Sequence, residues 1–172
     1  MNILISGGSG LIGTALTKEF LQLGHHVSIL TRNPDVVQMP DQVNKIAWDA
    51  KTMSGWEKVI ENTDAVIHLA GESIAGNGLL GLFPQRWSSY RKDLILKSRI
   101  ETGQVLTQAI ESANNKPKVF IQASAIGYYG PSESEDITES NNPGTDFLAQ
   151  VCESWESSTA LIGVGIRRVV AR

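Results

Sequence analysis

The sequence predicts an α/β fold in which a doubly wound parallel sheet has the strand order 3-2-1-4-5-6. Two observations carry this prediction. Short apolar runs alternate along the chain with longer segments whose apolar residues recur at helical spacing. The first run, Ile3–Ile5, leads directly into a glycine-rich turn at Gly7–Gly13, and an amphipathic segment follows. No linker, internal repeat or low-complexity tract divides the 172 residues, so we expect one domain over residues 1–172.

Composition and charge exclude several classes of protein. A hydrophobic content of 41% and a charged content of 19% are typical of a soluble globular protein. The net charge of −3 favours neither nucleic acid nor an anionic membrane as a partner. No run reaches transmembrane length, and the chain begins directly with a strand, so no signal peptide is expected. A single cysteine permits no intramolecular disulfide, which indicates the cytoplasm, and the scattered histidines predict no metal site.

The turn at Gly7–Gly13 predicts a dinucleotide site. Gly7 can adopt a positive φ for a sharp turn, Gly10 leaves room for a pyrophosphate, and Gly13 lets the helix lie close to the strand. The N–H groups of the first helical turn then face the phosphates, and the helix dipole favours their charge. The alternative is a tight turn without a ligand. The predicted contacts in this stretch are Gly7, Ser9, Gly10, Leu11, Ile12 and Gly13.

The first helix and second strand lead to a residue that distinguishes the two nicotinamide cofactors. The helix should run from about Leu11 to Leu23, where Gly24 provides a left-handed stop. Its apolar positions are Leu11, Ile12, Ala15, Leu16, Phe20 and Leu23. The strand His26–Leu30 ends in Thr31-Arg32, at the position that faces the adenosine ribose in dinucleotide folds. A permanently charged guanidinium suits a 2′-phosphate, so Arg32 predicts NADP, with a solvated arginine or a rival Asp35 as alternatives.

The central part of the chain supplies two further strands. We predict a strand at Val43–Trp48, a short helix at Trp56–Ile60 and an almost continuously apolar strand at Ala65–Ala70. Small residues at the end of this last strand, with Gly71 beyond it, would let the ribose or nicotinamide side of a cofactor approach the backbone. His68 is interpreted as a packed core histidine rather than a catalyst.

A long helix follows a glycine-rich loop. The loop at residues 76–84 is predicted to cover the site or to form a contact surface. The helix should begin at residue 85 or 86 and end near Ala113. Arg99 lies in its basic first half and is either solvated or turned inward to a phosphate. The expected buried stripe consists of Trp87, Tyr90, Leu94, Ile100, Val105, Leu106, Ala109 and Ile110.

The last third of the chain places polar groups at the end of a strand. The strand Val119–Ser124 ends in a serine, with Tyr128 and Tyr129 just beyond, where open α/β sheets bind ligands. The following acidic residues, Glu133, Glu135, Asp136 and Glu139, are interpreted as a solvated loop. Asp146 is the predicted N-cap of a helix that buries Cys152, and Val164–Ala171 is the sixth strand.

Six short motifs resemble the extended and atypical short-chain dehydrogenases/reductases, the group that includes sugar-nucleotide epimerases. They are ISGGSGLIG at Ile5–Gly13, HLAGE at His68–Glu72, Arg86-Trp87, Ser98-Arg99, SAIGYYG at Ser124–Gly130, and Cys152 with Trp155-Glu156. The match is closest to the cell-division inhibitor-like branch of the NAD-dependent epimerase/dehydratase family. The resemblance implies an NADP-binding Rossmann protein whose further cofactor contacts are Thr31, Arg32, Leu69, Ala70, Gly71, Arg99 and Ala123.

The chain departs from this family in two respects. Family members continue into a smaller C-terminal substrate-binding part, so we expect that part to be missing here, and an exposed sixth strand to favour a homodimer. Catalytic members also use a Tyr-x-x-x-Lys pair for proton transfer. Neither Tyr128 nor Tyr129 is followed by a lysine four residues later. Residues 147–152, where the pair would be expected, contain no tyrosine and no lysine.

Two functions therefore stay open. The first is an NADP-dependent epimerase or oxidoreductase that acts on a small molecule such as a sugar nucleotide. Ser124, with Tyr128 or Tyr129, would then be the catalytic group. The second is a non-catalytic NADP-binding module that senses the cofactor and signals to a partner.

Overall fold

The computed structural model of the chain describes residues 1–75, 87–131 and 136–172, and it confirms the predicted alternation of strands and helices. The elements in chain order are β1 (Asn2–Ser6), α1 (Leu11–Gln22), β2 (His26–Thr31), β3 (Asn44–Ala47), η1 (Glu57–Asn62), β4 (Ala65–His68), α2 (Ser89–Ser112), β5 (Val119–Ala123), η2 (Ile126–Tyr129), α3 (Phe147–Ser157) and β6 (Arg167–Ala171).

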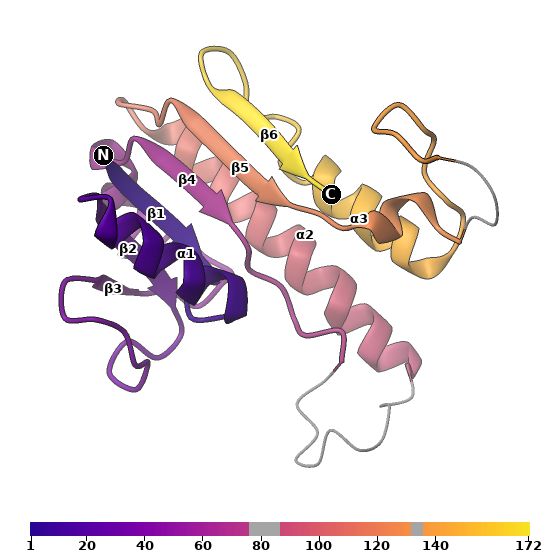
Figure 1. Cartoon of the computed structure of the whole chain (residues 1–172), viewed down its shortest axis with the longest axis horizontal. Helices are drawn as coiled ribbons and strands as arrows, with labels where there is room; N and C mark the ends of the chain where they lie inside the picture. Colours follow the sequence, from indigo (N-terminus) through magenta and orange to yellow (C-terminus); the bar gives the residue numbers. More distant parts are fainter. Residues whose placement is uncertain (76–86, 132–135) are drawn as a thin grey trace.

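The strands form one six-stranded sheet in the order β3-β2-β1-β4-β5-β6 (Figure 1). Every pair of neighbouring strands is parallel. The predicted strand order is therefore confirmed. The direction of winding reverses between β1 and β4, and their carboxyl ends consequently form the crevice in which open α/β sheets bind ligands.

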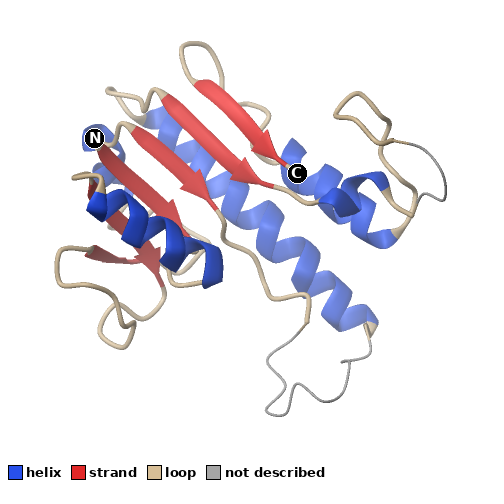
Figure 2. Cartoon of the chain, viewed as in Figure 1, coloured by secondary structure: helices blue, strands red, loops and turns tan. Residues whose placement is uncertain are grey.

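Helices cover both faces of the sheet. Figure 2 shows α1 in front of the strands and α2 and α3 behind them. Because successive side chains of a strand point to opposite faces, Ile3 and Ile5 of β1 pack on the side of α1, and Leu4 packs on the side of α2. The α2 side holds the larger core cluster, which includes Leu106 and Phe120.

The ends of two helices were predicted well. Gly24 adopts a φ of 75° just after α1, and its N–H donates to the carbonyl of Leu21 at 3.0 Å, as expected for a left-handed stop. Asp146 caps α3 by accepting the N–H of Ala149 at 2.9 Å. Cys152 is buried in α3, as predicted.

The expected buried stripes were wrong near the carboxyl edge of the sheet. On α2, Tyr90 is 73% exposed and Trp87, just before the helix, is 38% exposed, whereas Ile95 is buried. On α1, Leu16 and Phe20 pack against the core as expected, whereas Leu11 and Ile12 in the first turn, and also Ala15 and Leu23, are exposed. Both helices have their N-terminal turns beyond the ends of the strands, where no sheet lies beneath them (Figure 1). The spacing of apolar residues identifies which face of a helix is apolar. It does not show how much of the length of that face the sheet covers.

Several boundaries shifted by a few residues. α2 begins at Ser89 because the Ser88 hydroxyl accepts the N–H of Arg91 at 3.2 Å, which caps the helix. β6 begins at Arg167 rather than residue 164, and it forms an edge of the sheet. The expectations for the loop at 76–84 and for residues 133 and 135 fall outside the described residues. Within the described part, no helix combines the length and apolar character needed to cross a membrane.

Candidate functional site

A cavity of about 760 Å³ opens at the carboxyl edge of the sheet. It lies within the size range of small-molecule and cofactor sites. Its walls come from five segments: the glycine turn after β1, the end of β2, the loop after β3, the end of β4 and one face of α2. Of the sequence-predicted residues, the structure brings eight together along these walls, namely Gly7, Ser9, Gly10, Thr31, Arg32, Leu69, Ala70 and Gly71.

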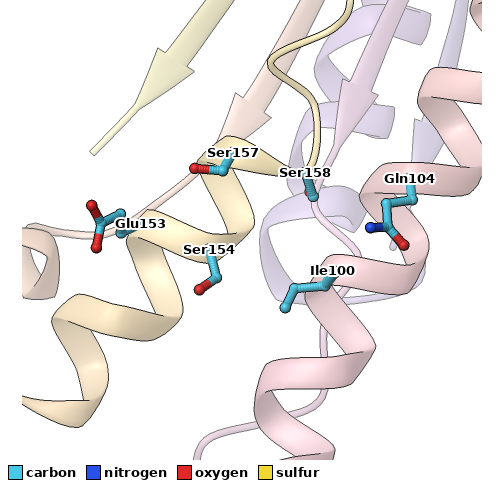
Figure 3. Close-up of a pocket in the computed structure, with 6 residues that line it drawn as sticks. All are labelled: Ile100, Gln104, Glu153, Ser154, Ser157 and Ser158. Carbon is cyan, nitrogen blue, oxygen red and sulfur yellow. The ribbon is translucent and has the colours of Figure 1, made fainter.

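A smaller hollow of about 370 Å³ lies elsewhere, between α2 and α3. Figure 3 shows Ile100 of α2 opposite Ser154 of α3, with Gln104 one turn further along α2. None of its lining residues comes from a strand end or from the glycine turn. The larger cavity is therefore the candidate site.

The glycine turn brings β1, α1 and β4 into close contact. Gly7 has a φ of 73°, and a Cβ atom placed on it would lie 2.8 Å from the backbone nitrogen of Ala70. A Cβ on Gly13 would lie 2.5 Å from the Gly7 carbonyl oxygen. No side chain of the described residues caps α1, and its first turn holds no acidic residue. Unpaired N–H groups therefore point from the helix N-terminus, which is the arrangement that binds phosphate.

Arg32 extends from the end of β2 at one end of the cavity. Its side chain is exposed, and no carboxylate in the described part of the chain forms an ion pair with it. The rival acid Asp35 does not line the cavity. The residue before Arg32, Thr31, is buried, and its hydroxyl accepts the N–H of Asn33 at 3.3 Å. This end of the cavity is thus cationic.

The segment after β4 is fixed to α2 by a group of hydrogen bonds. The Glu72 N–H donates to the Ser98 hydroxyl at 3.0 Å, and the Glu72 carbonyl accepts Arg99 Nη1 at 3.1 Å. Arg91 pairs with the Glu72 carboxylate at 2.8 Å and also donates to the carbonyl of Ser73. The segment that follows Ala70 and Gly71 is consequently held against α2.

Five sequence-predicted contacts lie outside the cavity that the described residues form: Leu11, Ile12, Gly13, Arg99 and Ala123. Arg99 is only 8% exposed and lies behind Gly71, where a Cβ would come within 3.1 Å of its Cζ atom. Its guanidinium donates to the carbonyls of Ile95 and Glu72 and lies 5.1 Å from the centre of the Trp155 ring. The Arg99 side chain therefore turns inward, as one of the two alternatives expected, and its hydrogen-bond partners are backbone carbonyl oxygens.

His68 is fully buried, in agreement with its interpretation as a packed core histidine. The Trp155 indole N–H donates to its Nε2 at 3.0 Å, so Nε2 is unprotonated and Nδ1–H donates to the Ser6 hydroxyl at 2.7 Å. Burial, with a smaller contribution from the charge of Arg99, lowers the pKa of His68 to about 3. The neutral imidazole joins β1 and β4 to α3.

The three candidate catalytic residues are brought together by two residues that sequence reasoning missed. The Ser124 hydroxyl donates to the Glu156 carboxylate at 2.6 Å. Arg172 holds the same carboxylate with two hydrogen bonds, of 2.9 and 2.7 Å, and donates to the Tyr129 hydroxyl at 3.0 Å. Its guanidinium lies 3.6 Å from the centre of the Tyr128 ring. Ser124, Tyr128 and Tyr129 therefore surround one ion pair.

Glu156 is a charged acceptor in this cluster. Partial burial raises the pKa of the Glu156 carboxyl, but the hydrogen bonds from Arg172 and Ser124 outweigh it, so the pKa lies below its usual value. Glu156 could have been found from the sequence, because Trp155-Glu156 is part of one of the six motifs that resemble the family. Cys152 precedes Glu156 by one helical turn, which places both side chains on the face of α3 beneath β5.

Comparisons with known proteins agree with this geometry. The epimerase family protein SDR39U1 of Bos taurus is 36% identical over 173 residues, which cover all of this chain and 53% of that protein. The epimerase family protein YfhF of Bacillus subtilis is also 36% identical and is covered to 54%. The crystal structure of human SDR39U1 (isoform 2) with NADPH shares 30% identity at a TM-score of 0.76, covering 99% of this chain and 52% of that chain.

A more distant solved structure shows the fold alone. UDP-glucuronic acid 4-epimerase from Bacillus cereus, in complex with UDP-glucuronic acid and NAD, has a TM-score of 0.77 at 20% identity and is covered to 55%. This chain spans about half the length of the curated relatives that it matches.

The doubly wound sheet and the glycine turn at its switch point define a Rossmann-type protein of the short-chain dehydrogenase/reductase class. A family model for the NAD dependent epimerase/dehydratase family matches residues 3–150. The chain belongs to this family.

Proposed function

We propose that this chain binds NADP(H) along the carboxyl edge of the sheet and forms the dinucleotide-binding part of an NADP-dependent enzyme. One observation carries the proposal: a single cavity connects the uncapped N-terminus of α1 with Arg32 at the end of β2. The N-terminus of α1, which the cavity reaches at Gly10, would hold the pyrophosphate. Arg32 would hold the 2′-phosphate, and the wall at Ala70 and Gly71 would face the nicotinamide ribose.

Three of the four carboxylates that line the cavity are already engaged, and the fourth, Glu101, lies on α2 and not at the end of β2. This favours NADP over NAD, because NAD requires an acceptor for its 2′-hydroxyl at the end of β2. The Asp49 carboxylate already accepts the N–H groups of Lys51 and Thr52, each at 2.8 Å. Asp93 pairs with Lys97, and Glu72 pairs with Arg91, both at 2.8 Å. The complex of human SDR39U1 with NADPH supports the same choice.

The proposed reaction is an epimerisation or oxidoreduction of a small molecule, such as a sugar nucleotide. When bound, the nicotinamide would accept or donate a hydride. The chain would supply the polar groups: Ser124 and Tyr129 have hydroxyls one hydrogen bond from Glu156 or Arg172, and Tyr128 packs on Arg172. These residues would substitute for the Tyr-x-x-x-Lys pair, which the start of α3 does not contain.

A specific observation favours the second candidate, a non-catalytic NADP sensor. The hydroxyls of Ser124 and Tyr129 are both engaged by the Glu156–Arg172 ion pair. A catalyst needs such a group within hydrogen-bond reach of the substrate proton, and a structural cluster does not. In a sensor, the cavity would still bind NADP, and the Glu156–Arg172 ion pair with its two hydroxyl partners would only stabilise the fold.

Titration of the 172-residue chain with NADPH and NADH, followed by nicotinamide fluorescence, tests cofactor binding. We expect NADPH to bind more tightly and the Arg32→Ala variant to lose at least about tenfold in NADPH affinity, as for one charge-assisted phosphate contact. Arg167→Ala, an exposed arginine at the start of β6, is the matched control. Equal affinity of the wild-type chain for both nucleotides would refute the NADP assignment, and no binding of either at millimolar concentrations would refute the proposal.

A further inference from the structure

The loop after β3 runs beside the end of β2, and it carries a second cation. β3 pairs with β2 in parallel, with Ala47 opposite Thr31. The Trp48 N–H then donates to the Thr31 carbonyl at 2.9 Å, so the loop starts next to the residue that precedes Arg32. Lys51 lies three residues further along, and it lines the same cavity as Arg32.

Asp49 holds the base of Lys51 in place. Its Oδ1 atom accepts the N–H groups of Lys51 and Thr52 at 2.8 Å, and its Oδ2 atom accepts the Thr52 hydroxyl at 2.9 Å. Ala50 completes the turn with a φ of 64° and packs against the core cluster that contains Trp48. The position from which the Lys51 side chain extends is therefore defined by the fold.

The charges around the cavity point to a dianionic ligand at this end, because the carboxylate of Asp49, which also lines the cavity, accepts hydrogen bonds from its own loop and forms no ion pair with Arg32 or Lys51. Lys97 also lines the cavity, but its ammonium is paired with Asp93 at 2.8 Å. Arg32 and Lys51 form no ion pair with any carboxylate in residues 1–75, 87–131 and 136–172. Two cations that face one cavity repel each other, and a phosphate monoester, with a charge of about −1.5 to −2 at pH 7, removes that repulsion.

We infer that Lys51 is a second determinant of NADP specificity, whose ammonium contacts the 2′-phosphate together with Arg32. This inference rests on the proposed function. The guanidinium of Arg32 would form a planar contact with two hydrogen bonds to the phosphate. The ammonium of Lys51 would add a single positive charge on a flexible side chain. NAD has an uncharged hydroxyl in place of this phosphate, so Lys51 affects discrimination between the two cofactors more than dinucleotide binding in general.

The test compares Lys51→Ala with Lys45→Ala in the full 172-residue chain. Lys45 is exposed on β3 and does not line the cavity, so its variant controls for loss of one positive charge. We expect Lys51→Ala to weaken NADPH binding by about three- to tenfold and to change NADH binding by less than about twofold. Lys45→Ala should leave both affinities within about twofold of wild type.

Isothermal titration with 2′,5′-ADP and 5′-AMP separates the phosphate contact from the rest of the cofactor. We expect Lys51→Ala to weaken 2′,5′-ADP alone and to reduce the salt dependence of its binding. An equal loss for both nucleotides, or a change no larger than that of Lys45→Ala, would overturn the role of Lys51. If Arg32→Ala removes the NADPH preference while Lys51→Ala does not, this inference fails and the proposed function stands. If the wild-type chain shows no preference, the NADP proposal itself fails.

Discussion

The Ser124 hydroxyl donates a hydrogen bond to the Glu156 carboxylate across 2.6 Å, and this contact joins the end of β5 to α3. Because the serine proton is directed at Glu156, the lone pairs of the Ser124 oxygen can accept a hydrogen bond from another donor. Arg172 donates to both oxygens of the same carboxylate, including the one that Ser124 contacts. The geometry thus makes Ser124 an acceptor whose orientation depends on a residue 32 positions away.

Replacing Glu156 with glutamine should destabilise the fold moderately. Glutamine keeps the shape of the side chain but removes the charge that pairs with Arg172. We expect a loss of about 1–2 kcal/mol in the free energy of unfolding, or about 2–8 °C in Tm, measured by circular dichroism. Glu153→Gln, an exposed neighbour on α3, is the control. Equal melting temperatures for the two variants would show that the ion pair does not stabilise the fold.

His68 should make stability depend on pH. The pKa of His68 is about 3 in the fold and about 6.5 when unfolded, so between these values the unfolded chain binds the extra proton. The free energy of unfolding should therefore fall as the pH is lowered through that window, by up to about 1.4 kcal/mol per pH unit. Urea unfolding of wild type and His68→Gln between pH 7.5 and 4.5 measures it.

The His68→Gln variant should have a flatter pH dependence than wild type, whatever its absolute stability. His26→Gln, which removes an exposed histidine at the start of β2, should keep the wild-type slope. A His68→Gln slope as steep as that of wild type would mean that other groups cause the pH dependence.

Gly7→Ala and Gly24→Ala separate backbone strain from steric clash. Both glycines have a positive φ, of 73° and 75°, but a Cβ on Gly7 would meet the backbone of Leu69 and Ala70, whereas one on Gly24 meets nothing within 4 Å. Gly24→Ala should cost about 1–2 kcal/mol of stability from strain alone. Gly7→Ala should cost more and should abolish NADPH binding. The measurements are denaturant unfolding and nucleotide titration; equal costs would indicate that the turn adapts.

Hydride transfer distinguishes the two candidate functions. If the chain forms part of an oxidoreductase, a protein that contains it should reduce NADP⁺ with a member of a panel of sugar nucleotides and secondary alcohols. If it forms part of an epimerase, which returns the hydride to its substrate, that protein should interconvert the epimers of a sugar nucleotide without net reduction of NADP⁺. Ser124→Ala should then lower the rate while leaving NADPH affinity unchanged, since Ser124 lies outside the cofactor cavity. Tight NADPH binding with no transfer across the panel would favour the sensor. The readouts are the absorbance of the reduced nicotinamide for net oxidation and the ratio of sugar epimers for epimerisation.

Local sequence patterns predicted the sheet and one end of the cavity because both depend on neighbouring residues. The strand–turn–helix at Gly7–Gly13 needs only glycines at defined positions, and Arg32 follows directly from the end of β2. The exposure of Tyr90 was missed because it depends on how far α2 extends beyond the sheet. Helical periodicity contains no information on that length.

The ion-pair cluster was missed because its members are distant in sequence. Glu156 meets Ser124 across 32 residues, and Arg172 meets Tyr129 across 43. Such contacts arise only after β6 has paired with β5 and α3 has packed beneath them. Lys51 is a similar case, since its place in the cavity follows from the pairing of β3 with β2 and from the turn that Asp49 forms.

The close approach of Gly7 to the start of the segment after β4 has a consequence for hydrogen exchange. Two stretches separated by some sixty positions share one contact, at Gly7 and at Leu69 and Ala70. Neither can open without disturbing the other, so a nucleotide seated on either stretch should slow deuterium uptake in both to a comparable degree.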